Sequence, residues 1–286
     1  MRRIAAIVLV DPRGWLLLQE RDEHAPVDPD TWGMVGGGVD DGEDDTVGAL
    51  RELAEETGLT GIDLDQLGVF SFYCDGCAES HEVALFVAHT QLTDADVECH
   101  EGRQIVFVDP RTIHTLDWNR ALAVALPRVI GSPSYVERFG RREPRRFACA
   151  LLVDGAGRVL LQERDGGAPI DPDKWGMPGG HLDPGEDPET GAYRELEEET
   201  GVRLPPGTLE LFAEIAVYHP HYGSVDSNHV YAARLDLTDA DIDCHEGRQI
   251  VFVAPGRALA LDLTMSGVLA LPAFLGSEEY RALTSS

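Results

Sequence analysis

Apolar runs separated by turn residues open each half of the 286-residue chain. Runs at 4–10 and 147–153 lead into the turns "DPRG" and "DGAG", and second runs follow at 15–19 and 158–162. Short, continuous apolar runs bounded by turn residues are typical of buried strands. We therefore predict that each half begins with two buried β-strands.

A helix is predicted after the glycine-rich loop of each half. The segment from Arg51 to Gly58 reads "RELAEETG", and the segment from Arg194 to Gly201 reads "RELEEETG". Glycine directly after such a run is a common helix stop. Apolar strands at "VALFVAHT", "HVYAARL" and two "QIVFV" segments follow, and an apolar helix, "ALAVALPRVI" or "GVLALPAFL", ends each half. Both halves thus have the same predicted order of elements.

The second half of the chain repeats the first. "LLLQERDEHAPVDPDTWGMVGGGVDDGED" recurs as "VLLQERDGGAPIDPDKWGMPGGHLDPGED", and "LTDADVECHEGRQIVFV" recurs as "LTDADIDCHEGRQIVFV". The shift of 143 residues in the first pair is the size of a domain rather than of a solenoid repeat. We predict two homologous domains, 1–140 and 145–286, joined by the polar segment "FGRREPRR" at 139–146.

Composition excludes some partners. The net charge of −28 argues against non-specific binding to polymeric nucleic acid or to an anionic membrane. The apolar runs are far shorter than the roughly 20 residues that span a bilayer, and the apolar start breaks at Asp11 and recurs in mid-chain, so it is not a signal peptide. We expect a cytoplasmic location. Five cysteines then predict free thiols, including Cys74 and Cys77, whose spacing is half of a zinc site.

The acidic octapeptides carry the chemistry. On a helix, Glu52, Glu55 and Glu56 share one face, while Leu53 points toward a core. Like charges at these spacings repel one another, and a divalent cation removes the repulsion, since clustered carboxylates suit hard ions such as Mg²⁺. Taken alone, the pattern favours a solvated acidic face. The same arrangement recurs at Glu195, Glu198 and Glu199.

The surrounding residues favour the cation site. Gly37, Glu43 and the segment from Arg51 to Leu59 fit the pattern GX5EX7REUXEEXGU, where U is aliphatic, and the second half fits it again from Gly180 to Val202. In this the chain resembles the Nudix hydrolase family, over both halves. The resemblance implies two α/β/α sandwich domains with mixed sheets in tandem, arranged as an internal pseudo-dimer in a monomer or paired in a homodimer.

The resemblance also implies roles for these residues. Metal ligands and catalytic carboxylates for Mg²⁺ or Mn²⁺ would be Glu52, Glu55, Glu56, Glu195, Glu198 and Glu199, with the carbonyls of Gly37 and Gly180. Arg51 and Arg194 would pair with Glu43 and Glu186 and hold the loop against the helix. Glu101 and Glu246, in the duplicated "HEGRQ", are candidates for a further ligand or base, and a capping role in a loop has equal weight.

Candidate substrate contacts are less specific. Arginines are good phosphate partners, and these candidates are Arg21, Arg103, Arg164 and Arg248, for which surface ion pairs are the competing interpretation. The two halves differ at positions expected to face the substrate, where the second half has His181, His219, His221 and His229 and the first has Asn119, a residue able to read a base edge. These differences predict different substrates, or one domain that binds and another that cleaves.

The implied activity is hydrolysis of a diphosphate linkage in a nucleoside diphosphate linked to X, where X covers triphosphates, modified nucleotides and nucleotide sugars. Metal ions would neutralise the phosphate oxygens and a glutamate would take a proton from water. A nucleotide-binding sensor is the alternative, because fold does not establish activity. A chain in which only one domain turns over is a third.

Overall fold

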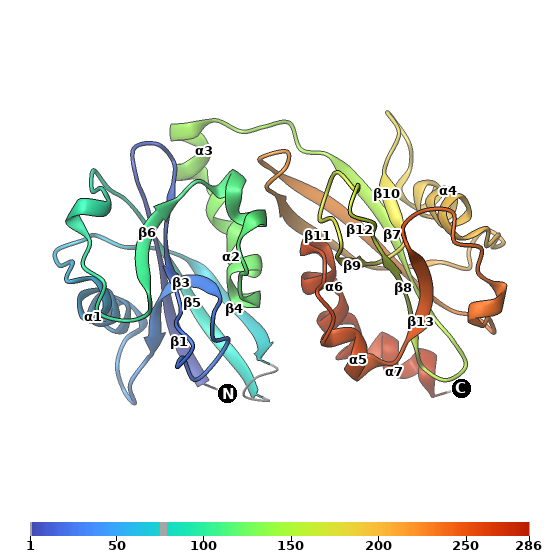
Figure 1. Cartoon of the computed structure of the whole chain (residues 1–286), viewed down its shortest axis with the longest axis horizontal. Coiled ribbons are helices and arrows are strands. Elements are labelled where there is room, and N and C mark those ends of the chain that lie inside the picture. Colours follow the sequence, from blue (N-terminus) through green and yellow to red (C-terminus); the bar gives the residue numbers. More distant parts are fainter. Residues whose placement is uncertain (1, 75–78, 286) are drawn as a thin grey trace. The chain divides into compact units, whose positions relative to one another are not determined.

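The computed structural model describes residues 2–74 and 79–285 and divides the chain into two compact units, Met1–Arg141 and Arg142–Ser286. Each unit is a mixed α/β structure (Figure 1), which confirms the predicted fold class. The strands and main helices of the first unit are β1 (Arg2–Val10), β2 (Leu16–Glu20), β3 (Trp32–Gly38), α1 (Asp45–Thr57), β4 (Asp65–Cys74), β5 (Glu79–His89), β6 (Gln104–Val108), α2 (Arg120–Ile130) and α3 (Pro133–Phe139).

The second unit repeats this order with two differences, a broken strand and a short α-helix in place of the 3₁₀ helix that follows β6. Its strands and helices are β7 (Arg146–Val153), β8 (Val159–Glu163), β9 (Trp175–Gly176), β10 (Gly179–His181), α4 (Pro188–Thr200), β11 (Glu210–His219), β12 (Ser224–Arg234), β13 (Gln249–Val253), α5 (Pro255–Leu259), α6 (Met265–Leu275) and α7 (Glu278–Thr284). Single 3₁₀ turns precede β6 and β13, and another follows β6.

Each unit is built on a mixed sheet. In the first unit the strand order is β4-β5-β1-β3-β2-β6, with β1 parallel to β5 and the other pairs antiparallel. In the second unit the order is β11-β12-β7-β8-β13, and β7 is parallel to β12. The apolar runs predicted as strands are β1, β2, β7 and β8.

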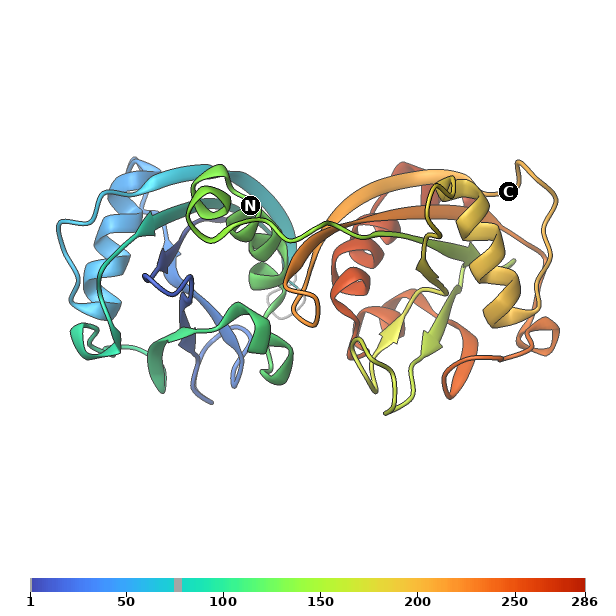
Figure 2. The same cartoon turned by 90° about the horizontal axis from the view of Figure 1, so that it is seen from above.

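The central strand buries both of its faces, as the continuous apolar run predicts. In β7, Ala150 and Leu152 pack in one core with Leu196 of α4. The alternate residue Leu151 packs in a second core with Phe274 of α6. Side chains of a strand alternate between faces, so one strand joins both layers, and Figure 2 shows α4 and α6 on opposite faces of their sheet.

Local sequence sets the bounds of the acidic helix. Asp44 caps α1 by accepting a hydrogen bond from Thr46 N at 2.9 Å. Gly58 ends it in the left-handed conformation, with φ of 71°. In the second unit Asp187 and Gly201 play the same parts around α4. The helix ends predicted from the two glycines are therefore confirmed.

A proline explains the broken strand. Val35 in β3 pairs with Ile7 of β1, but the second unit has Pro178 at this position, between β9 and β10. Proline has no N–H to donate to the ladder. Its carbonyl still accepts a hydrogen bond from Ala150 N at 3.0 Å, so the segment stays against β7.

Among the helices that the structure describes, none combines the length and the apolar character needed to cross a membrane.

Gly179, which follows Pro178, packs closely against β7, and a substitution there tests this packing. Gly179 has φ of +148°, and a Cβ there would lie 2.4 Å from the Ala148 carbonyl oxygen. We predict that Gly179→Ala lowers the free energy of unfolding by roughly 2–5 kcal/mol, through clash and backbone strain. Gly185→Ala is the matched control, because Gly185 also has positive φ but faces open space, and should cost about 1 kcal/mol. Urea unfolding of the full chain measures both, and equal losses would contradict the packing argument.

Candidate active site

The acidic helix is fixed by its apolar side. Leu53 is fully buried against the sheet, and the residues on either side of it therefore border the edge of that contact. Glu56 is drawn in with the helix and is only 4% exposed, whereas Glu55 is exposed. The three glutamates predicted to share one face thus have three different environments.

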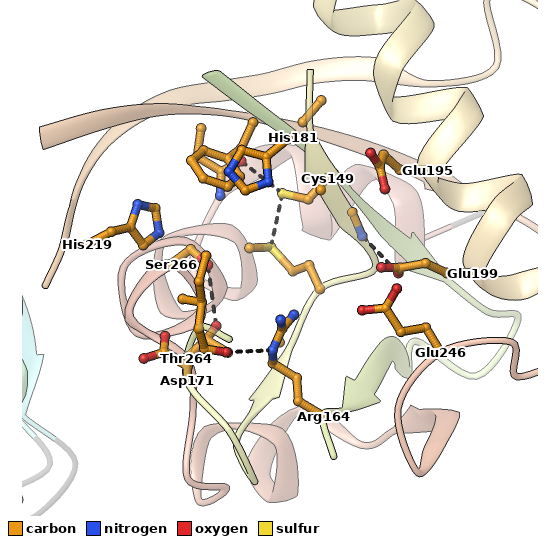
Figure 3. A pocket seen from close by; sticks show the side chains of 18 of the residues that line it. Cys149, Arg164, Asp171, His181, Glu195, Glu199, His219, Glu246, Thr264 and Ser266 are labelled. Carbon is orange, nitrogen blue, oxygen red and sulfur yellow. Dashed lines mark hydrogen bonds between the residues drawn. The ribbon is translucent and has the colours of Figure 1, made fainter. Parts of the chain in front are cut away.

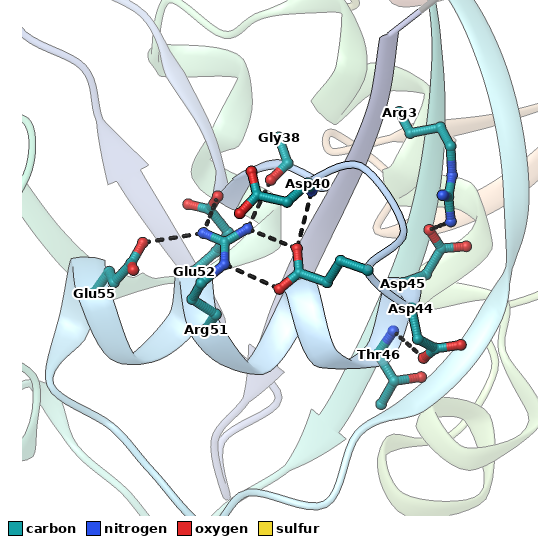
Figure 4. A network of polar contacts seen from close by, with 10 residues as sticks. Arg3, Gly38, Asp40, Asp44, Asp45, Thr46, Arg51, Glu52 and Glu55 are labelled. Carbon is teal, nitrogen blue, oxygen red and sulfur yellow. Dashed lines mark hydrogen bonds and ion pairs between the residues drawn. The ribbon is translucent and has the colours of Figure 1, made fainter.

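An arginine organises the exposed part of the site (Figure 4). Arg51 donates two hydrogen bonds to Glu43, at 2.9 and 3.1 Å, and one to the Gly38 carbonyl at 2.8 Å. It also contacts Glu52 at 2.8 Å and Glu55 at 3.1 Å. A single guanidinium therefore links the glycine-rich loop, the start of the helix and two of the candidate ligands. Arg194 makes the same set of contacts with Glu186, Glu195, Glu198 and the His181 carbonyl.

The glycines of the loop make room for a carboxylate. A Cβ at Gly37 would lie 2.6 Å from Glu52 Oε2, and one at Gly180 would lie 2.5 Å from Glu195 Oε2. Any side chain at these positions would displace the glutamate. The loop and the helix are thus shaped for each other at the candidate ligands.

The most buried carboxylate is held by weak donors. Glu56 Oε2 accepts hydrogen bonds from Gly36 N and Gln19 Nε2, each at 3.3 Å. Burial raises the pKa of Glu56 to about 8, and the charges of Glu101 and Glu52 add to the rise. Glu199 is equally buried and accepts from Gly179 N at 3.0 Å. Burial, together with the charge of Glu246, raises the pKa of Glu199 to about 8.

The loop that carries Glu101 is bound to the C-terminus of the helix. His100 N donates to the Glu56 carbonyl at 2.9 Å, and His100 Nδ1 donates to the Glu55 carbonyl at 2.8 Å. These carbonyls have no partner within the helix, so the loop caps it. Glu101 is thereby placed beside the helix glutamates. His245 makes both contacts in the second unit, to Glu199 and Glu198.

The candidate residues meet at one cavity in each unit. The first cavity has a volume of about 320 Å³, and the predicted residues that line it are Arg21, Gly37, Glu52, Glu56, Glu101 and Asn119. The second has a volume of about 410 Å³ and is lined by the predicted residues Arg164, Gly180, His181, Arg194, Glu195, Glu199, His219 and Glu246. Figure 3 shows this second cavity, with its glutamates gathered on one side.

Several predicted residues lie outside these linings. Arg103 is ion-paired with Glu23 and Asp30, so its charge is balanced by carboxylates. This is the surface ion pair that we gave as the alternative to phosphate binding. Arg248 is likewise paired, with Glu163 and Asp173. The rest are Glu55 and Glu198, each held by the organising arginine, His221, which packs on Tyr222, and His229, whose Nδ1 donates to the Phe147 carbonyl. Cys77 and the side chain of Cys74 lie outside the described residues.

Two buried glutamines are site residues that sequence reasoning missed. Gln19 Nε2 bridges Glu56 Oε2 and the Glu101 carbonyl, the latter at 3.2 Å. Gln162 Nε2 contacts the Glu246 carbonyl at the same distance. Each is 1% exposed. The sequence feature that could have identified them is the glutamine that both copies keep at the end of an apolar strand, in "LLLQE" and "VLLQE".

The donor set fits a hard divalent cation. Carboxylate oxygens reach the first cavity from Glu52, Glu56 and Glu101 and the second from Glu195, Glu199 and Glu246, and their mutual repulsion is what an ion of this kind removes. Within residues 2–74 and 79–285, no group of three or more acidic, histidine or cysteine side chains is arranged so that it could hold a metal ion. Mg²⁺ commonly keeps several positions for water and substrate phosphate, so an incomplete protein shell is compatible with it.

The fold and the site define a class of protein, a tandem α/β/α sandwich with an acidic helix beside a polar cavity in each domain. The chain belongs to the Nudix family, since the model of the NUDIX domain matches residues 1–128 and 143–266. This confirms the resemblance drawn from the two octapeptides.

Named relatives match parts of the chain. An RNA pyrophosphohydrolase of Caulobacter vibrioides is 50% identical over 58 residues, which are 20% of this chain and 33% of the relative. A putative 8-oxo-dGTP diphosphatase of Bacillus subtilis is 32% identical over 111 residues, 38% of this chain and 66% of the relative. Among solved structures, a MutT NUDIX hydrolase from Burkholderia pseudomallei is 26% identical, with a TM-score of 0.38, over 46% of this chain and 97% of that one. The chain thus spans about a third of the length of the RNA pyrophosphohydrolase.

The raised pKa values predict how stability depends on pH without metal. Because the folded state holds the protons of Glu56 and Glu199 up to about pH 8, whereas a free glutamate releases its proton near 4.5, the unfolded chain binds fewer protons in this window. In a chelator, the free energy of unfolding should therefore fall as pH rises from 4.5 to 8, by at most about 1.4 kcal/mol per pH unit for each group.

Unfolding by urea across this pH range, in excess chelator, measures the slope. The double variant Glu56→Gln/Glu199→Gln should be the more stable protein at the upper end and should have a flatter profile. Glu279→Gln, an exposed position of α7, is the control and should retain the wild-type slope. A slope that survives the double substitution would assign it to other groups.

Proposed function

We propose that both domains hydrolyse a diphosphate linkage in a nucleoside diphosphate linked to X, with Mg²⁺ or Mn²⁺. The observation that carries the proposal is the buried glutamate of each cavity, Glu56 or Glu199, which lies near further carboxylates and whose hydrogen-bond donors among the described residues are amide groups. A buried, uncompensated charge is costly. A buried glutamate in both domains is explained if a cation and a phosphate bind beside it and stabilise its charge.

The chain's own residues supply the remaining functions. Glu52 and Glu56, with Glu55 once released from Arg51, would hold the ion together with the carbonyl of Gly37, a residue that lines the same cavity. When bound, the ion neutralises phosphate oxygens and lowers the pKa of a water. The corresponding groups of the second domain are Glu195, Glu198, Glu199 and Gly180.

A base and a phosphate contact complete the site. Glu101 lines the cavity near Glu56 and forms no ion pair with an arginine among the described residues, which suits it to accept a proton from water. Arg21 donates from its Nε to the Val27 carbonyl at 3.0 Å and lines the cavity, which supports its proposed role as the phosphate contact. Glu246 and Arg164 occupy these positions in the second domain.

Small nucleotides fit the chain better than polymeric RNA. The net charge of −28 repels a polyanion, and the cavities have the size of a small-molecule site. The relatives named for RNA match only part of their length. We therefore infer a small-molecule partner, a cytoplasmic location and no membrane partner, with the two domains in one chain or in a homodimer.

Phosphate or nucleotide release from a panel of nucleoside triphosphates, nucleotide sugars and a 5′-triphosphorylated RNA tests the proposal in Mg²⁺ and in Mn²⁺. We predict that Glu56→Gln and Glu199→Gln each abolish one domain's contribution, and that the double variant loses roughly 10²–10⁴-fold in rate. The loss follows from the missing ligand and the missing charge.

Glu279→Gln controls for a general effect of lost charge and should retain the wild-type rate. A wild-type protein that binds nucleotides but releases nothing in either metal would be a sensor. A rate that depends on Glu199 alone would restrict turnover to the second domain.

A further inference from the structure

The two sides of the second cavity differ in chemistry. Figure 3 shows Glu195, Glu199 and Glu246 on one side and His219, Thr264 and Ser266 on the other. If the acidic side holds phosphates through a cation, as proposed above, the opposite side meets the other end of the substrate. The groups there are not used by the hydrolytic step.

A buried histidine is oriented on that side. His219 Nδ1 lies 2.8 Å from Asp226 Oδ2, and the two side chains are 6% and 0% exposed. The other Asp226 oxygen accepts a hydrogen bond from Arg145 N at 2.8 Å. In a neutral ring the hydrogen on Nδ1 is donated to the carboxylate, so Nε2 carries a lone pair. The ring lines the cavity, and Nε2 is paired with no group among the described residues.

A second polar group lies on the same face of β12. Asn228 follows Asp226 by two residues, is 5% exposed and lines the cavity. Its Oδ1 accepts a hydrogen bond from Cys149 Sγ at 3.3 Å. Burial raises the pKa of the Cys149 thiol, which keeps it a donor. The Asn228 oxygen is thereby occupied and its NH₂ group is left as a donor toward the cavity.

Aromatic rings form the adjoining wall. The ring centroids of Phe147 and His181 are 4.2 Å apart, and Tyr222 meets His181 edge-on at 5.7 Å. All three line the cavity. Ring faces beside a fixed acceptor and a fixed donor suit a planar heterocycle, which stacks on rings and presents hydrogen-bonding groups at its edge.

The first domain lacks this wall. Its strands keep the same register, because Ile4 pairs with Val83 as Phe147 pairs with Asn228. The residues that stand at the positions of Cys149, His181 and Asn228 are Ala6, Gly38 and Val83. All of them line the first cavity. The carboxylate side is therefore duplicated, while the opposite side is not.

We propose that His219, oriented by Asp226, reads the nucleobase of the second domain's substrate by accepting a hydrogen bond from an exocyclic amino group. Asn228 donates beside it, and the Phe147, His181 and Tyr222 rings pack on the base. The inference rests on the proposed function and adds base specificity to one of its two sites. The second domain accordingly prefers an amino base to the corresponding oxo base, and the first domain does not share this preference.

The test compares ATP with ITP and CTP with UTP, since in each pair an amino group is replaced by an oxo group and the ring nitrogen beside it changes from an acceptor to a donor. The full chain carries Glu56→Gln, so that the second domain alone turns over. We predict that kcat/KM favours the amino base by about 10-fold, the cost of a mismatched buried hydrogen bond. Asp226→Asn should remove the preference. Its oxygen stays on Arg145 N, its NH₂ group donates to His219 Nδ1, and Nε2 becomes a donor facing the amino hydrogens.

Two further variants define the effect. Ser227→Ala lies on the same strand but on the other face, where its hydroxyl donates to Glu214, and should leave the preference unchanged. His219→Phe keeps a ring without the acceptor. It should also lose the preference, which keeps the inference testable if Asp226→Asn does not fold.

The outcomes separate this inference from the proposed function. If no nucleotide is hydrolysed, the proposed function fails first. If the nucleotides are hydrolysed and the amino-to-oxo ratio is the same in wild type, Asp226→Asn and His219→Phe, base reading by His219 is wrong while hydrolysis stands. Base reading by His219 would also be overturned if Asp226→Asn or His219→Phe lowered kcat equally for both members of each pair. A wild-type preference for the oxo base would overturn it as well.

Discussion

The bonds made by one partly exposed guanidinium determine the geometry of each site. Arg51 and Arg194 bind the loop glutamate, a loop carbonyl and two helix glutamates at once. Without this guanidinium, the carboxylates of the glycine-rich loop and of the acidic helix would repel each other. The fork geometry of arginine matters, because a lysine ammonium is a point charge that cannot bind Glu43 with two parallel bonds.

The arginine of each site leaves the charge of one helix glutamate without a cationic partner. It neutralises the glutamates at the rim, but Glu56 and Glu199 lie deeper and receive only amide donors, so their pKa values rise to about 8. The same helix therefore carries carboxylates that arginine satisfies and one that it does not. We propose the innermost glutamate as the place for a cation, with Glu55 and Glu198 exchanging between the arginine and the ion.

The sequence predicted the parts of the fold that depend on local rules. Asp44 and Gly58 bound α1 by capping chemistry that is visible in the letters, and continuous apolar runs form the central strands. The break in the strand at Pro178 follows from one missing N–H. The family pattern also located the acidic helix and the loop that Arg51 holds against it.

What the sequence did not provide was the pairing of residues across strands. His219 is oriented by its hydrogen bond to Asp226, and the register of β11 against β12 brings the two side chains together. Gln19 belongs to the site because β2 brings its amide between Glu56 and the Glu101 loop. Arg103 is excluded because Asp30 and Glu23 already bind it. Each of these facts depends on contacts between distant segments, which no local pattern encodes.

The duplication separates two kinds of constraint. The residues that hold charge, from Arg51 to Glu101, recur with nearly the same distances in both domains, because a carboxylate cluster tolerates little change in geometry or partner. The opposite wall is free of that constraint, and it has changed from Ala6 and Val83 to Cys149 and Asn228 at unchanged strand register. Side chains on this wall alter only what lies beyond the phosphates. Two copies with one chemistry can thus diverge in the ligand they accept without disturbing the helix on which the chemistry depends.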